Sequence, residues 1–188
     1  MDNIAVFCAS SGLIDEIYKQ DAQKLGEVIG KRGWQLVFGG TNRGLMRIVG
    51  NATMSAGGKT LGIIPACLQE RGIAAQWVTT QIVTPDMKER KALMRSQADA
   101  FVALPGGWGT LEEIIEVITL KQLGEHTKPI VFLNTNGFYE EFLFFIAQAR
   151  EKKFISHAYD SLYYVANNVE EAIAYLDAYV AKDVASKY

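Results

Sequence analysis

A glycine-rich turn followed by two carboxylates is the part of this sequence whose residue types best suit chemistry. It lies between an apolar run at 100–104, typical of a buried strand, and a helical pattern at 111–123. Backbone N–H groups at a helix N-terminus bind phosphate, because they lack partners within the helix and lie at the positive end of its dipole. The pattern therefore predicts an enzyme-like site that combines phosphate binding with carboxylate chemistry. Its residues are Gly106, Gly107, Trp108, Gly109 and Thr110, with Glu112 and Glu113 one turn later.

A second candidate group lies on the predicted helix that opens at 84–86. Its residues Met87, Arg90, Lys91 and Met94 share one helical face by their i, i+3, i+4 and i+7 spacing. Two methionines around two cations are unusual for a solvated surface, so this face is suited to lining a pocket. An exposed face of ion pairs, with the long basic side chains covering apolar neighbours, explains the same spacing equally well. Pro85 suits the first turn of this helix.

Glu113 also has a purely structural interpretation. Thr110 and Glu113 have the spacing of a capping box, in which the two side chains bond each other's backbone N–H groups at the start of a helix. The pattern favours this cap. A carboxylate held there beside a phosphate site is also well placed for chemistry, and the two roles are compatible.

Alternating strands and helices must position these groups. Apolar strand patterns alternate with helical patterns along the chain, which is typical of a parallel sheet covered on both faces. We therefore predict a doubly wound α/β fold that forms one domain over residues 1–188, in which the ambiguous residues 67–75 form one helical turn and a loop. The predicted strands lie at 4–9, 35–38, 60–64, 77–83, 100–104, 128–133 and 162–165, and the predicted helices at about 15–31, 44–56, 84–98, 111–123, 139–152 and 169–180.

Three strand-to-helix loops carry glycine or small residues, at 10–12, 39–44 and 105–110. Ligands of open α/β sheets bind beyond the carboxyl ends of the strands, so we expect these loops, which include Ser10 and Gly40, to meet at one site. Glycine also serves tight turns, but three loops at equivalent positions favour a shared ligand. The first loop lacks G-x-G-x-x-G and the P-loop lysine is missing, which disfavours NAD, FAD and nucleoside triphosphates.

Composition narrows the remaining function classes. A formal net charge of -2 and a pI near 5.7 disfavour binding to a nucleic-acid backbone. The chain has no apolar run of about 18 residues and no basic N-terminal region, so we expect no membrane span, no signal peptide and a cytoplasmic protein. Cys8 and Cys67 are too few for a zinc site, and Cys8 is expected to be a buried free thiol.

These motifs resemble those of the Lonely Guy family, the cytokinin riboside 5′-monophosphate phosphoribohydrolases, which are often mislabelled lysine decarboxylases. Residues 105–113 match the family's P-G-G-x-G-T-x-x-E motif, and residues 86–91 resemble its D-M-x-x-R-K helix. The loops at 7–11 and 39–46 are similar to the first two loops of the family. The similarity extends over most of the chain, from Ile4 to about Val180.

The resemblance implies a Rossmann-like fold that hydrolyses the N-glycosidic bond of a nucleoside 5′-monophosphate, AMP or an N6-modified AMP, without a cofactor or metal. It assigns catalysis to Glu113, which supports an oxocarbenium-like state or orients water, and to Arg90, which is always charged and fixes the glutamate. Replacing either residue by alanine should nearly abolish base release and leave the fold intact. The implied substrate contacts are Ser10, Gly40, Lys91, Gly106, Gly107, Trp108, Gly109, Thr110, Glu112 and Thr119.

The resemblance also implies a homodimer. The helix at 111–123 is apolar on more than one face, which fits either an internal helix or packing against a second copy. The family is usually dimeric, and this favours the second copy. Thr119 lies two turns below Glu112 and could then reach the pocket across that interface.

Two departures from the family pattern concern the second loop, where Thr41 and Arg47 replace glycines, and a third is Trp108 in place of a common tyrosine. Glu70 is a further candidate for contact with the base or ribose. The alternative function is a carrier that binds a nucleotide or a molybdopterin-type cofactor on the same fold without cleaving it. Retention of Arg90 and Glu113 favours the enzyme, and no lysine is marked for the Schiff base that lysine decarboxylation needs.

Overall fold

Seven parallel strands form one sheet in the order β4-β3-β2-β1-β5-β6-β7. The computed structural model describes residues 1–182 of the chain. The predicted doubly wound, Rossmann-like α/β fold is confirmed, because the strand order reverses between β1 and β5 and every pairing is parallel. The strands are β1 (Asn3–Phe7), β2 (Gln35–Phe38), β3 (Lys59–Pro65), β4 (Thr80–Thr84), β5 (Ala100–Ala103), β6 (Ile130–Leu133) and β7 (Tyr164–Ala166).

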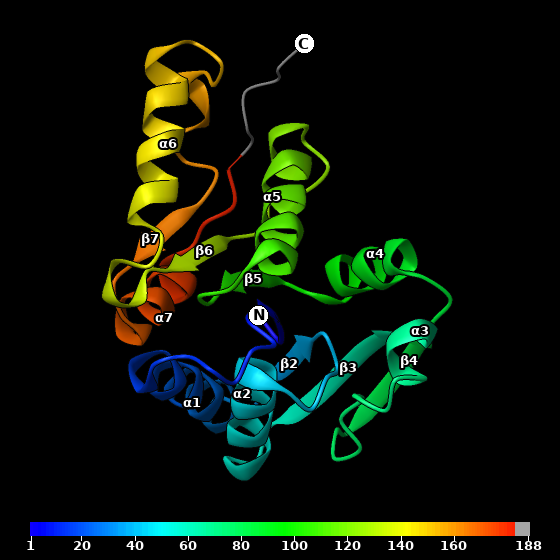
Figure 1. Cartoon of the computed structure of the whole chain (residues 1–188). Helices are drawn as coiled ribbons and strands as arrows, with labels where there is room; N and C mark the ends of the chain where they lie inside the picture. The colour runs from blue at the N-terminus through cyan, green and yellow to red at the C-terminus, as the bar shows by residue number, and fades with distance from the viewer. Residues whose placement is uncertain (183–188) are drawn as a thin grey trace.

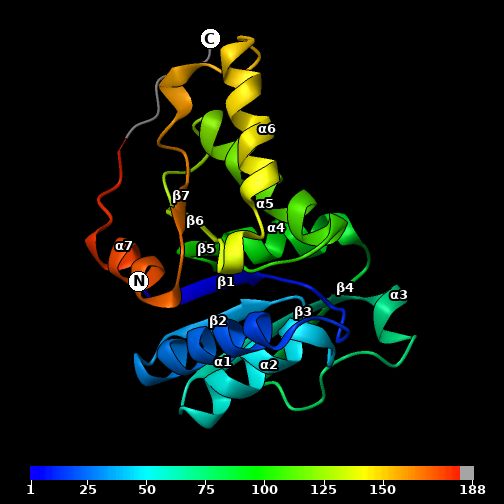
Figure 2. The same cartoon turned by 60° about the vertical axis from the view of Figure 1, so that its left-hand side comes forward.

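Helices cover both faces of the sheet (Figures 1 and 2). One face carries α1 (Glu16–Lys31), α2 (Gly44–Ser55) and α7 (Val169–Ala178), and the other carries α4 (Met87–Gln97), α5 (Trp108–Gln122) and α6 (Glu140–Glu151). The short helix α3 (Ala66–Gln69) lies at the β4 edge, and two 3₁₀ turns, η1 (Thr135–Gly137) and η2 (His157–Tyr159), flank α6. No helix within residues 1–182 has both the length and the apolar character to cross a bilayer.

Two buried clusters hold the layers together, one on each face of the sheet. Alternate residues of β1 point to opposite faces, so Ile4 and Val6 join the cluster under α1, α2 and α7, while Ala5 and Phe7 join the cluster under α4, α5 and α6. All the strand residues of β5 and β6 are buried, as expected for central strands covered on both sides. The sheet is therefore a rigid platform for the loops at its carboxyl edge.

The start of α5 differs from the sequence prediction. The helix begins at Trp108 rather than Leu111, with Gly107 as its N-cap, and the backbone N–H of Leu111 donates to the Gly107 carbonyl at 3.0 Å. Thr110 is thus the third residue of the helix and not its cap. The predicted capping box is wrong, because Glu113 lies one turn inside the helix and its side chain binds another partner.

Two smaller predictions near α4 are also corrected. Asp86 is the N-cap of α4 and its side chain accepts a hydrogen bond from the Glu89 backbone N–H at 2.8 Å, so Pro85 precedes the helix instead of occupying its first turn. The strand predicted at 77–83 begins only at Thr80. Trp77 precedes this strand. Its ring stacks on Phe38, and its indole N–H donates to the Asn42 side-chain oxygen at 2.9 Å.

The carboxyl ends of β1 and β5 are bonded to each other. The backbone N–H of Leu104 donates to the Phe7 carbonyl at 3.0 Å, and that of Ala9 donates to the Pro105 carbonyl at 3.2 Å. The backbone N–H of Leu45 donates to the Ala9 carbonyl at 2.9 Å, which brings the start of α2 to the same place. The three glycine-bearing loops therefore meet at the point where the strand order reverses, as their positions predict.

Candidate active site

A cavity of about 420 Å³ opens where these loops meet. Residues from the ends of β1, β2 and β5 and from helices α2 to α5 surround it. Its volume lies within the range of about 300–1,000 Å³ that is usual for small-molecule sites. The lining residues are Cys8, Ala9, Ser10, Ser11, Thr41, Met46, Leu68, Ile73, Met87, Arg90, Gly107, Trp108, Gly109, Thr110 and Glu113.

A buried ion pair between Arg90 and Glu113 forms one wall of this cavity. The two residues are 4% and 6% exposed, and an Arg90 guanidinium Nη1–H donates to the Glu113 carboxylate. Arg90 Nε donates at 3.0 Å to the backbone carbonyl of Ile63 in β3, which fixes the plane of the guanidinium. The pair joins α4 to α5, so the two elements that the sequence motifs marked are connected by the residues expected to act together.

Burial raises the pKa values of two groups that line this part of the cavity, Glu113 and Cys8. Desolvation raises the pKa of Glu113 above its ordinary value, while the Arg90 guanidinium opposes that rise. Desolvation also raises the pKa of the Cys8 thiol, with the Glu113 charge adding to the effect. Cys8 is therefore an unreactive thiol at neutral pH, and the prediction that it is buried and free is confirmed.

The glycine turn presents bare backbone to the cavity. A Cβ added at Gly106 would overlap the Thr110 hydroxyl, whereas one added at Gly107 or Gly109 would meet nothing within 4 Å. Gly106 is thus required for close packing under the turn and does not line the cavity itself. Gly107, Gly109 and Thr110 line it at the positive end of α5, which is a suitable position for a phosphate.

The second glycine-bearing loop, residues 39–44, packs against the Arg90 side chain of the ion pair. A Cβ added at Gly39 would overlap the Arg90 guanidinium, so glycine there makes room for the arginine. Gly40 has a φ of +68° and packs on the backbone of Gly62, and it does not line the cavity. Ser10 does line it, together with its neighbour Ser11 from the same predicted loop.

Three other predicted contacts also lie outside the cavity. Lys91 forms ion pairs with the carboxylates of Glu112 and Glu116, the latter at 3.4 Å, so these charges tie α4 to α5 on the solvent side. The Thr119 hydroxyl donates to the Ile115 carbonyl within α5 at 2.8 Å. Of the face predicted on α4, Arg90 and Met94 are buried and Met87 is 42% exposed, so the face serves both the cavity and an ion-paired surface.

The apolar part of the cavity was not predicted from the sequence. Met46, Leu68 and Ile73 line it, from α2, α3 and the segment that follows α3. An isolated β-bridge between Thr41 and Ala74 brings that segment over the site. No local sequence pattern predicts such a contact. Glu70 is exposed and does not line the cavity.

The two departures in the second loop have different positions. Thr41 lines the cavity, and its hydroxyl contacts the sulfur of Met46 at 3.0 Å. Arg47 is exposed and lines a separate hollow of about 130 Å³. Within residues 1–182, no group of three His, Cys, Asp or Glu side chains could hold a metal ion.

Comparison with known proteins assigns the chain to a family. Residues 46–176 match the family model described as "Possible lysine decarboxylase". The cytokinin riboside 5′-monophosphate phosphoribohydrolase LOG2 of Arabidopsis thaliana is 42% identical over 179 residues, which cover 95% of this chain and 84% of that protein. The cytokinin riboside 5′-monophosphate phosphoribohydrolase LOG of Oryza sativa subsp. japonica is 41% identical over 94% of this chain and 73% of its own length.

Solved structures share the architecture. The Moco carrier protein of Chlamydomonas reinhardtii has a TM-score of 0.70 and 26% identity, and the match covers 94% of this chain and 95% of that one. The molybdenum cofactor binding protein of Rippkaea orientalis has a TM-score of 0.73 at 24% identity, with 94% and 96% covered, and this likeness concerns the fold alone. The sequence matches are stronger and extend over both motifs, and they show that the chain belongs to the Lonely Guy family of cytokinin riboside 5′-monophosphate phosphoribohydrolases.

Proposed function

We propose that this protein is a phosphoribohydrolase that cleaves the N-glycosidic bond of AMP or an N6-modified AMP, giving the free base and ribose 5-phosphate. The observation that carries the proposal is the buried pair of Arg90 and Glu113 beside bare amides at the start of α5. A phosphate and a sugar bound in one cavity can use both features at once. The names of the relatives support the same reaction class.

In this mechanism the phosphate binds the backbone N–H groups of Gly107 and Gly109 and the Thr110 hydroxyl. The anomeric carbon then lies beside Glu113. As the bond to the base breaks, positive charge develops on the sugar, and the carboxylate stabilises it, as carboxylates do in glycoside hydrolysis. A water oxygen bonds to the anomeric carbon, the bonding electron pair leaves with the base, and the base gains a proton.

The two members of the pair have different tasks. Arg90 has only N–H donors, so it acts by binding oxygens and by holding Glu113 in place. The raised pKa of Glu113 brings the carboxylate closer to the range in which it can accept a proton from water. Because the ionised form is the active one, the rate should fall as the pH decreases through this pKa.

The cavity also has an apolar wall that suits the base. Met46, Leu68, Ile73 and Met87 offer a surface on which a purine and an apolar N6 group would be favourably buried. We expect an N6-alkylated AMP to be cleaved with a lower KM than AMP. A panel of nucleoside monophosphates compared by kcat and KM measures this preference.

A carrier function is the second candidate, and the likeness to the Chlamydomonas reinhardtii Moco carrier protein favours it. Incubating the full chain with AMP and separating the products by chromatography distinguishes the two. The enzyme releases adenine and ribose 5-phosphate in equal amounts. Saturable binding of AMP without any adenine would contradict the enzyme and support the carrier.

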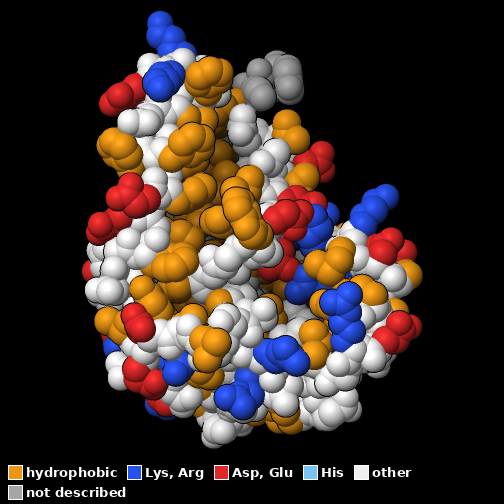
Figure 3. Space-filling view, viewed as in Figure 1, with side chains coloured by type: hydrophobic (Ala, Val, Ile, Leu, Met, Phe, Trp, Pro, Cys, Tyr) orange, Lys and Arg blue, Asp and Glu red, His pale blue; other side chains and the backbone are white. Residues whose placement is uncertain are grey.

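We also propose that the protein is a homodimer formed through α5 and α6. Hydrophobic side chains gather where these helices lie (Figure 3), and Ile115, Phe144 and Phe145 are 41%, 60% and 63% exposed. Trp108, on the rim of the cavity, is 90% exposed, and a second copy would cover it. Light scattering should give the dimer mass for the wild type and the monomer mass for Phe145→Glu, with Met54→Glu, an exposed site on α2 at the opposite face of the sheet, as the matched control. A monomeric wild type would contradict this proposal.

A further inference from the structure

Lys121, in the last turn of α5, is a buried amine that the proposed reaction does not use. The residue is 2% exposed. Its Nζ donates to the Lys128 backbone carbonyl at 2.9 Å and to the Tyr179 hydroxyl at 3.1 Å, and it lies 5.1 Å from the centre of the Tyr179 ring. Both hydrogen-bond partners are neutral, and no carboxylate within residues 1–182 forms an ion pair with this amine.

A buried ammonium without an anion is unfavourable, and Lys121 shows the consequence. Desolvation lowers its pKa to about 8. An ammonium has three donors, of which two are used here within the described chain. An anion placed against the third would offset the desolvation that the fold imposes.

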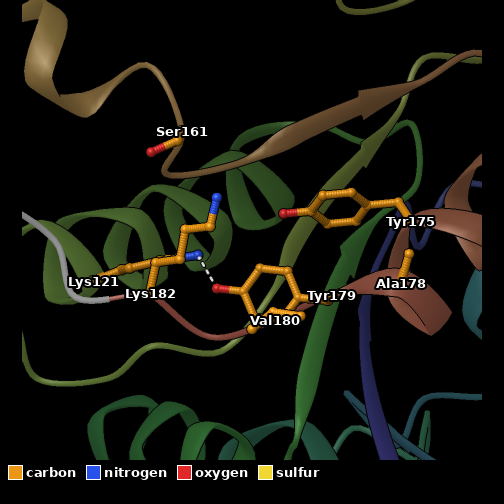
Figure 4. Close-up of a pocket in the computed structure, with 7 residues that line it drawn as sticks. All are labelled: Lys121, Ser161, Tyr175, Ala178, Tyr179, Val180 and Lys182. Atoms are coloured by element: carbon orange, nitrogen blue, oxygen red, sulfur yellow. Dashed lines mark hydrogen bonds between the residues drawn. The ribbon is translucent and has the colours of Figure 1, made fainter.

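A cavity of about 350 Å³ lies directly against this amine. Figure 4 shows the Lys182 amine and the Tyr175 hydroxyl pointing toward the same space, with Ser161 above them and Lys121 and Tyr179 joined by a hydrogen bond below them. The remaining wall consists of apolar atoms, from Ala178, Val180 and the two tyrosine rings. The cavity thus combines two cations and two hydroxyls with an apolar side.

We infer that this cavity is a second ligand site, separate from the candidate active site, which binds a small organic anion. The carboxylate of the ligand lies against the amines of Lys121 and Lys182, and its aromatic or aliphatic body lies on the tyrosine rings and Val180. No bond is made or broken, so the site is one of recognition. The inference does not depend on the proposed hydrolysis, so a result against one leaves the other unchanged.

Benzoate is a suitable probe, because it joins a carboxylate to an aromatic ring and remains ionised above pH 6. Calorimetric titration of the full chain at pH 7 should give saturable binding that is at least tenfold weaker in Lys121→Met, which removes the charge and keeps the length of the side chain. Lys182→Met should weaken binding by a smaller factor, and Lys59→Met, an exposed lysine on β3, should leave it unchanged. Urea unfolding of each variant confirms that it is folded.

The pH dependence supplies a second readout. Only the protonated amine attracts the carboxylate, so the affinity of the wild type should fall about tenfold per pH unit above pH 8, and that of Lys121→Met should not. Equal affinity in the wild type and Lys121→Met, or no saturable heat at millimolar benzoate, would overturn the inference.

Discussion

Arg90 and Lys121 are both cations buried on the same side of the sheet, at 4% and 2% exposure, in neighbouring helices α4 and α5. Arg90 faces a carboxylate and a backbone carbonyl, whereas Lys121 faces a carbonyl and a hydroxyl. The hydrogen bonds around Arg90 fix the direction of its guanidinium. The surroundings of Lys121 lower its pKa to about 8, and no carboxylate within residues 1–182 pairs with its amine.

This difference shows that burial of a cationic side chain does not by itself determine what the site around it can do. A paired charge has a set geometry, which suits a reaction in which a carboxylate must stay at one position beside a sugar. A lone amine is suited to binding, because its interaction with an anion is not yet satisfied. Four predictions test this contrast, from the largest expected effect to the smallest.

The first concerns the free energy of unfolding. Arg90→Ala leaves the buried Glu113 carboxylate without its ion-pair partner. Loss of one partner of a buried pair typically lowers the free energy of unfolding by about 3–5 kcal/mol. That the variant keeps its fold stays a prediction from the sequence, and the burial of the pair adds that the folded variant is less stable. Lys121→Met should be neutral or stabilising, since a buried charge gives way to an apolar side chain. Urea unfolding measures both, and equal losses in the two variants would remove the contrast.

The second concerns stability at alkaline pH. The pKa of Lys121 is about 8 in the folded chain and near its ordinary value of 10.5 when unfolded, so between these values the unfolded state binds more protons. Stability contributed by this residue therefore rises with pH across that window, by an amount on the order of 2–3 kcal/mol. Lys121→Met should lack the rise. A wild type and variant with parallel stability curves from pH 8 to 10 would show that the amine titrates normally.

The third concerns the loop beside the paired charge. Gly106→Ala should lower the free energy of unfolding by about 1–3 kcal/mol, because the added Cβ overlaps the Thr110 hydroxyl in a packed turn. Gly107→Ala is the matched control, since its added Cβ meets nothing within 4 Å. Thermal unfolding of the two neighbours gives the comparison. If both lose the same stability, close packing is not what requires glycine at 106.

The fourth concerns charges that are paired but only partly buried. Arg95 and Lys91 on α4 both pair with Glu116 on α5, at 2.8 Å and 3.4 Å, and the side chains of all three are 17–32% exposed. Arg95→Met should cost less than about 1 kcal/mol, since water screens such pairs, and 0.5 M salt should reduce the difference further. A loss as large as that of Arg90→Ala would mean that pairing, and not burial, determines the effect.

The sequence was sufficient for the fold and for the centre of the candidate site. Uniformly apolar strands such as 130–133 and the glycine turn after β5 are local signals, and they lie where the pattern predicts. The motif residues Arg90 and Glu113 are 23 positions apart, and the resemblance, not their spacing, put them together.

Contacts that depend on tertiary packing could not be predicted. Lys91 and Glu112 belong to the same motifs as the buried pair and are each adjacent to one of its members, yet a step of one residue along the helix turns them toward the surface. Which of the two adjacent glutamates is buried depends on how α5 packs against α4 and the sheet. The apolar wall from Leu68 and Ile73 arises from a segment without regular periodicity. Lys121 carries no motif, and its burial follows from the packing of the chain around Tyr179.

The most direct test of the account compares AMP cleavage by the wild type, Glu113→Gln and Glu116→Gln. Glu116 lies one turn further along α5 and does not line the cavity, so it is the matched control. We predict equimolar adenine and ribose 5-phosphate from the wild type, a rate lower by about 10²–10³ in Glu113→Gln, and a rate within a few-fold of wild type in Glu116→Gln. Cleavage by Glu113→Gln at the wild-type rate would contradict the role given to the buried pair.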